Sequence, residues 1–305
     1  MSFEFIGNRD QKSRADNNVI AFEYDEEKDS ELAEILTRVD LPLMESIFRE
    51  RIGHSEGASE QINFKKVDQI FSGRPKAKKT FDPREGLGFY NAWDDDIVVS
   101  FDNIKYKFGE ENAELALIHI LSHEQGHATA KHTFLDNDLQ GATEDSPQRA
   151  CVLGYAELEV YETDAQGNIG DHLAKHALFD EAVTEKLARQ VFDEYIARSG
   201  QYDDEAVESF KKRREEVLGE YGHEAYVEVL DIIISEISKN TGISEDVIWK
   251  DIQRGRQEGL EFDDEIRALI VKTFSEEFYE ALRNSHVAKI AEYIDSPKLK
   301  EFIKK

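Results

Sequence analysis

Between residues 113 and 132 the apolar residues recur at the spacing of a helix rather than at the alternation of a strand. The residues that set this spacing are Leu115, Leu117, Ile118, Ile120 and Leu121. Acidic residues gather where the first turn would lie, and negative charge stabilises the positive N-terminal end of a helix. The pattern therefore predicts a buried helix over this stretch.

Two patterns on either side of this helix predict strands. Residues 88–101 indicate two strands, the second carried by the apolar, β-branched run from Ile97 to Val99 and by Phe101. Residues 155–162 alternate, and turn residues follow at 164–168, which predicts a hairpin. Together with the helices, these strands predict an α+β fold with a small mixed sheet.

The C-terminal part of the chain has helical patterning throughout. Turn signals divide it into expected helices at 181–199, 204–219, 224–240, 244–255, 263–283 and 285–294. Near the N-terminus we expect helices at 31–37 and 43–51, after polar residues that form a mobile arm or an edge strand. The predicted organisation is an acidic arm over 1–40, a core over 41–200 and an all-helical lobe over 201–305.

Charge and composition exclude several classes of protein. The 305 residues carry a formal charge of −27, a field that repels nucleic acid and anionic membranes. No apolar run approaches the length of a membrane span, and the N-terminus lacks the apolar segment of a secretory signal. Cys151 is the only cysteine, so no internal disulfide forms, and we expect a protein of the reducing cytoplasm.

One stretch runs against the acidic composition. Residues 65–84 contain seven Lys or Arg residues, with Gly73 and Pro75 marking a loop. The stretch lacks interleaved aromatic residues of the kind that stack on bases, which disfavours a nucleic-acid site. A solvated loop, or one that contacts an acidic partner, is the interpretation that we prefer.

The predicted helix carries the chemistry in His123-Glu124-Gln125-Gly126-His127, an HExxH sequence. Residues four apart lie on one face of a helix, so His123 and His127 can ligate one ion, as zinc requires. Glu124 lies about 100° around the helix, where it can take a proton from a zinc-bound water. This assignment of roles follows the metalloprotease signature. A buried helix with structural histidines is the alternative.

A catalytic zinc site needs a third protein ligand. The chain does not continue as HExxHxxGxxH, because Thr133 stands where the third histidine would be and His132 comes one residue early. The preferred candidate is Glu181, followed one turn later by Glu185 on a predicted second helix. Weaker alternatives are Glu157 and Glu159 on the alternating strand, and Cys151.

This combination of motifs resembles the gluzincin type of zinc metallopeptidase. The resemblance covers roughly residues 95–189 and rests on HExxH and on a later helix reading E-[AG]-x-[AT]-E. It implies a zincin-like core in which Glu181 is the third Zn²⁺ ligand and Glu185 supports the site from outside. The long gap between His127 and Glu181 leaves room for an inserted element.

The resemblance also implies a donor for the oxyanion and a strand that binds substrate. Tyr226 and His223, at the start of a predicted helix, are the candidates for the donor, with ordinary packing as the alternative for each. The strand around Ile97 would border the cleft and pair with an extended peptide, unless it is a plain core strand. We assign His119 to packing or to support of the ligands.

The sequence therefore predicts a cytoplasmic zinc metallopeptidase that hydrolyses peptide bonds in a peptide or protein substrate. The alternative is a non-catalytic interaction protein on the same fold, which would use its acidic helical lobe to bind a protein partner. Metal content and hydrolysis of a mixed peptide library distinguish the two.

Overall fold

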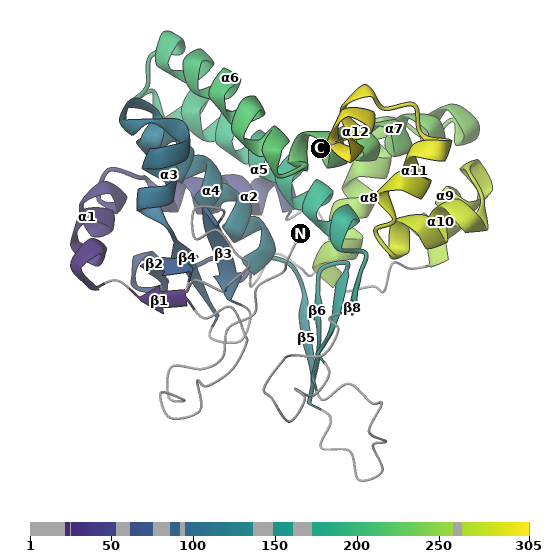
Figure 1. Ribbon diagram of the computed structural model, residues 1–305, viewed down its shortest axis with the longest axis horizontal. Helices are drawn as coiled ribbons and strands as arrows, with labels where there is room; N and C mark the ends of the chain where they lie inside the picture. Colours follow the sequence, from purple (N-terminus) through teal and green to yellow (C-terminus); the bar gives the residue numbers. More distant parts are fainter. Residues whose placement is uncertain are drawn as a thin grey trace.

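The computed structural model describes residues 22–24, 26–52, 62–75, 86–91, 95–136, 149–160, 173–258 and 264–304. The described chain is mostly helical and carries two small sheets, which agrees with an α+β class. In Figure 1 the N-terminal helices and one of the sheets lie on one side of the molecule, and the C-terminal helices gather on the other. Helices α4 (Ala113–Ala128) and α5 (Ala177–Ser199) lie between these two groups.

The first sheet is mixed and has the strand order β1-β2-β4-β3. Its strands are β1 (Phe22–Tyr24), β2 (Ile70–Pro75), β3 (Gly88–Asn91) and β4 (Asp96–Val99). β2 and β4 are parallel, whereas the β1–β2 and β3–β4 pairs are antiparallel. The edge-strand interpretation of the N-terminal region is correct for β1, while residues before 22 lie outside the described part.

The strand around Ile97 is an inner strand of the sheet, so the expectation that it pairs with an extended peptide is wrong. β4 lies inside the sheet with all four residues buried, and β3 forms the edge beside α4. An apolar run without alternation is typical of a strand buried on both faces. Phe101 also differs from the prediction, because it begins helix α3 (Phe101–Phe108) instead of ending the strand.

The predicted motif helix is α4 (Ala113–Ala128), which a short 3-10 turn, η4 (Glu110–Asn112), precedes. Every residue of α4 except Glu114 is buried. A helix that is buried on all sides needs neighbours all around it, and α4 packs most extensively against α5 (Ala177–Ser199). This packing brings the two predicted ligand segments together.

The gap between the two motif helices holds a second, antiparallel sheet. Its strands follow chain order as β5 (His132–Asp136), β6 (Arg149–Leu153), β7 (Ala156–Val160) and β8 (Leu173–Lys175). A turn at Gly154, with φ of +59°, joins β6 to β7 and was not expected. The expected turn at 164–168 lies outside the described residues. Figure 1 shows this sheet extending away from the helices.

The helices of the N- and C-terminal segments agree with prediction in order and differ at their ends. They are α1 (Glu26–Leu36), α2 (Leu41–Ile52), α6 (Asp204–Glu220), α7 (His223–Thr241), α8 (Glu245–Glu258), α9 (Asp264–Thr273), α10 (Glu276–Arg283), α11 (Val287–Tyr293) and α12 (Pro297–Ile303). The 3-10 turn η3 (Val67–Gln69) is not among the expected elements. The single helix expected at 263–283 is two helices. Ser275 starts the second, because its hydroxyl accepts a hydrogen bond from the Phe278 amide at 3.1 Å.

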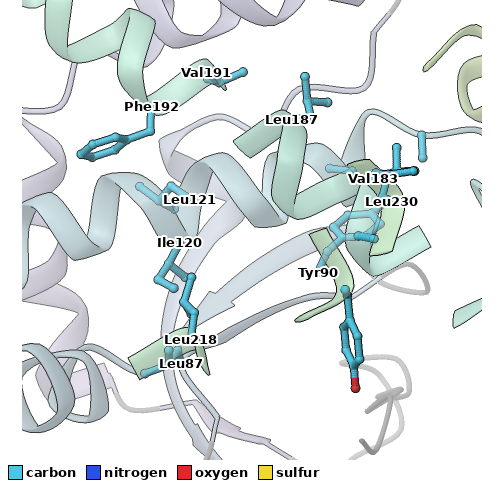
Figure 2. Packing of buried hydrophobic residues seen from close by; sticks show 14 of the residues in the cluster. Leu87, Tyr90, Ile120, Leu121, Val183, Leu187, Val191, Phe192, Leu218 and Leu230 are labelled. Carbon is cyan, nitrogen blue, oxygen red and sulfur yellow. The ribbon is translucent and has the colours of Figure 1, made fainter. Parts of the chain in front are cut away.

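One hydrophobic core runs through the described helices and the first sheet. Leu121 of α4, Leu187 of α5 and Leu230 of α7 belong to it, and Figure 2 shows them with their neighbours. Core residues come from both sides of position 200, and the predicted domain boundaries stay predictions. Among the helices that the structure describes, none is long and apolar enough to cross a membrane.

Candidate metal centre

The last two turns of α4 and the first turns of α5 bring three predicted ligands to one point. Nε2 of His123 and Nε2 of His127 are 3.2 Å apart. The carboxylate of Glu181 bridges them, with Oε2 3.4 Å from Nε2 of His123 and Oε1 3.3 Å from Nε2 of His127. All three residues are buried, and together they could hold a metal ion.

The spacing of these atoms fits a small tetrahedral ion. Two ligand atoms that are each about 2.0–2.1 Å from a tetrahedral centre lie about 3.3 Å from one another. The separation of the two imidazole nitrogens is close to this value, and each of these nitrogens has one oxygen of the Glu181 carboxylate at a similar distance. Among the described residues no fourth side chain joins this set, so one position of a tetrahedral ion would have no protein ligand from them. Two imidazoles and one carboxylate are a known donor set for catalytic zinc.

Charge favours the ligand form of Glu181. Burial opposes its ionisation, but His127 and His123 together hold the pKa of the carboxyl well below its ordinary value. The group is therefore a carboxylate at neutral pH, as metal ligation requires.

Glu185 holds the far side of His123. Its Oε2 lies 3.0 Å from Nδ1 of His123, and its Oε1 contacts Nε2 of His119 at 3.2 Å and Nε of Arg189 at 2.7 Å. A carboxylate on Nδ1 fixes the ring and leaves Nε2 for the metal. The observed contacts match the supporting role that the resemblance implies. His119, which also packs against Phe192, stands outside the ligand set as expected.

A second set of three could also hold an ion, and it shares His123 with the first. It consists of His123, Glu185 and His223. This set is the poorer one, because the Glu185 carboxylate is already bonded to His119 and Arg189. Glu181, by contrast, has both oxygens directed at the two motif histidines.

Comparisons of the chain with protein-family models, with curated proteins and with solved structures found no match. The arguments for a function therefore come from the residues and from the geometry of this site.

Glu124 lies beside the three ligands without joining them. It is buried, and the backbone amide of Tyr90 in β3 is hydrogen-bonded to it. Burial raises the pKa of the Glu124 carboxyl, and the negative charge of Glu181 adds to this increase against the opposing effect of the histidines. A carboxylate with a raised pKa is a better proton acceptor, which suits a general base.

His223 and Tyr226, the two predicted oxyanion donors, lie on the first turn of α7. Nδ1 of His223 is 4.0 Å from Oε2 of Glu181, and its ring centroid is 5.3 Å from that of His123. Within the described part of the chain this Nδ1 is buried without a hydrogen-bond partner. The Tyr226 ring is tilted against that of His223 with a centroid separation of 6.4 Å, and the pKa of Tyr226 is raised by burial and by the charge of Glu181. His223 therefore lies beside the predicted metal ligands, and Tyr226 lies next to His223.

Of the remaining candidates, His132 is the one whose side chain the structure describes, and it stands apart from the ligands. Nε2 of His132 lies 3.2 Å from the His127 carbonyl oxygen, outside both sets of ligands. Cys151, Glu157 and Glu159 belong to β6 and β7, and their side chains lie outside the described residues.

The predicted basic stretch 65–84 is only partly described, and its first member is not a surface charge. Lys65 is buried with an exposed fraction of 1%, and its ammonium is paired with Asp95. Its backbone is hydrogen-bonded to Gln125 of the motif in both directions. Lys65 therefore anchors the chain to α4 and offers no charge to a partner, while most of the other cations lie outside the described residues.

Two residues that sequence reasoning missed surround the other histidine. Asp180 places Oδ2 3.5 Å from Nδ1 of His127, and Arg256 of α8 is ion-paired to Asp180. Asp180 directly precedes Glu181 in the sequence, so its position close to the site could have been anticipated. Nothing in the sequence connects Arg256 to the motif, because the contact is formed by tertiary packing.

Gly126 makes the close approach of the two ligand helices possible. A Cβ at this position would lie 2.9 Å from Cγ2 of Thr184 on α5, nearer than carbon atoms normally approach. We expect Gly126→Ala to destabilise the metal-free protein by about 1–3 kcal/mol in urea unfolding, with the better helix propensity of Ala offsetting part of the strain.

A second substitution tests this explanation. Thr184→Ser removes the clashing methyl group and keeps the hydroxyl, which accepts a hydrogen bond from Arg256 at 2.6 Å. In the Gly126→Ala/Thr184→Ser protein the missing methyl group should relieve part of the strain. The double variant should therefore lose less stability than the sum of the two single losses. Strictly additive losses in the double-mutant cycle would show that the methyl contact is not the cause.

Proposed function

We propose that this protein is a zinc metallopeptidase with a zincin-like core similar to that of the gluzincins. The observation that supports the proposal is the buried set of His123, His127 and Glu181, with no fourth ligand among the described residues and with the carboxylate of Glu124 beside it. A closed set of four ligands would instead have pointed to a structural ion.

The residues around the site can carry out peptide hydrolysis in a simple sequence. Zinc held by the three ligands would supply Lewis acidity and a water whose pKa is lowered to about 7. Glu124 accepts the proton of the attacking water and later delivers it to the leaving amine. In this proposal His223 and Tyr226 would donate hydrogen bonds to the oxygen of the tetrahedral intermediate.

The edge strand β3 is the natural place for an extended substrate. It runs beside α4, and its Tyr90 amide already contacts Glu124. A peptide that adds to a sheet edge gains backbone hydrogen bonds, with side-chain pockets setting specificity. A peptide on this edge would place its carbonyl groups close to Glu124. β3 therefore replaces the strand around Ile97 in the proposed substrate-binding role.

A mixed peptide library tests the proposed activity. The protein should cleave a subset of the library, a chelator should stop the cleavage, and added zinc should restore it, all followed by mass spectrometry. We propose the cytoplasm as the site of action, on the basis of the single cysteine. A protein that binds zinc and cleaves no member of a broad library would favour the interaction protein of the alternative hypothesis.

A further inference from the structure

Arg256 of α8 is a charged residue at the centre of four elements. Its exposed fraction is 1%, and it donates hydrogen bonds to the Gly126 carbonyl oxygen of α4 and to the Thr184 hydroxyl of α5, both at 2.6 Å. The backbone carbonyl oxygen of Arg256 accepts a hydrogen bond from the backbone amide of Lys131, just after α4. The turn between β6 and β7 packs against the Arg256 side chain, since a Cβ on Gly154 would lie 2.9 Å from it.

The guanidinium of Arg256 donates two hydrogen bonds to the Asp180 carboxylate. Nε lies 2.9 Å from Oδ1, and Nη2 lies 3.3 Å from Oδ2. The Tyr155 amide also donates to Oδ1 at 3.0 Å. These three donors hold the carboxylate in one orientation, with Oδ2 toward Nδ1 of His127.

The two metal histidines are supported in the same way from different sources. His123 is backed by Glu185 and Arg189, both from α5. His127 is backed by Asp180 of α5 and by Arg256, which comes from α8. Both chains of contacts reach beyond residue 200, since Arg189 also pairs with Glu224 of α7, but only in the second does the arginine itself come from there. The Arg256 contact with the Gly126 carbonyl also fixes the backbone beside His127.

We propose that Arg256 is a positioning residue of the metal centre, which fixes the His127 ring through Asp180 and the Gly126 carbonyl. The proposal rests on the proposed zinc site and adds that the C-terminal helices contribute to its affinity. The pair is poorly explained as a device for stability alone, because a buried ion pair often stabilises a fold no more than apolar residues of the same size. A partner that orients a ligating histidine typically changes metal affinity by about 10–100-fold.

The experiment uses the full chain and Co²⁺ or Zn²⁺ as the probe. Arg256→Lys keeps the charge but loses the two-donor grip, and Arg256→Met/Asp180→Asn removes both charges, so that no uncompensated charge is buried. Arg254→Met is the matched control, since Arg254 lies on the same helix, is largely exposed and pairs with Asp251. Metal affinity is measured by competition with a chelator, the ligand geometry by the visible spectrum of the cobalt protein, and the metal-free stability by urea unfolding.

Both Arg256 variants should bind zinc about 10–100-fold more weakly than the unmodified protein, with a shifted cobalt spectrum, and Arg254→Met should change neither. A merely structural role would lower metal-free stability and leave the affinity and the cobalt spectrum of the folded double variant unchanged. That result would overturn the inference and leave the proposed function intact, as would equal losses in Arg254→Met. An unmodified protein that binds neither metal would instead reject the metal site itself.

Discussion

Glu124→Gln is expected to retain zinc and to lose peptide hydrolysis by at least about 10²–10⁴-fold, the contribution typical of general acid–base catalysis. The substitution preserves the size of the side chain and its ability to accept the hydrogen bond from Tyr90, but an amide cannot take the proton from water. The ligands should be unaffected, because Glu124 is not a member of the ligand set. Zinc content and the rate of cleavage of a library peptide are the two measurements.

Glu114→Gln on the same helix is the control for this prediction. Glu114 is the one residue of α4 that is not buried, and its carboxylate contacts Arg38 and Tyr202 instead of the metal ligands. This variant should cleave at the original rate. Loss of zinc from Glu124→Gln would make Glu124 a structural residue, whereas unchanged hydrolysis would mean that the activity arises elsewhere.

The second large effect concerns the ligands themselves. Glu181→Ala should weaken zinc binding by more than the roughly 10–100-fold that is typical of residues behind the ligands, because both oxygens of Glu181 face the motif histidines. His123→Ala and His127→Ala should abolish binding. Glu185→Gln should weaken zinc binding only within this range of roughly 10–100-fold. Of the two nitrogens of His123, the Glu185 carboxylate contacts only Nδ1, the one on the far side from the other ligands. Chelator competition on the purified variants measures all of these affinities.

The order of the losses decides between the candidate ligands. Glu157→Ala serves as a control from the alternatives considered for the third ligand and should bind zinc normally. Normal binding in Glu181→Ala combined with a severe loss in Glu185→Ala would favour the second set, in which Glu185 and His223 join His123.

The sequence was most informative where the relevant contacts are local. The spacing of His123 and His127 is a property of a single helix, and their adjacent nitrogens in α4 follow from it. Glu181 could be identified because Glu185 follows it one helical turn later, which is again a spacing within one helix. The packing of α5 on α4 then brings Glu181 to the histidines. Both helices were predicted within a few residues of their observed positions.

The errors occurred where tertiary packing decides. The apolar character of β4 shows that it is buried but cannot say which of its neighbours forms the edge of the sheet. Lys65 looked like a surface cation, and only the fold shows that Asp95 accompanies it into the interior. Arg256 carries no local signal at all, since its partners lie far away in sequence.

Elemental analysis of the purified protein tests the central claim most directly. The buried set of His123, His127 and Glu181 predicts about one zinc per chain, and the His123→Ala protein, purified in the same way, should contain none. A protein that is purified without zinc and takes up none on addition would contradict the metal centre and the proposed function that depends on it.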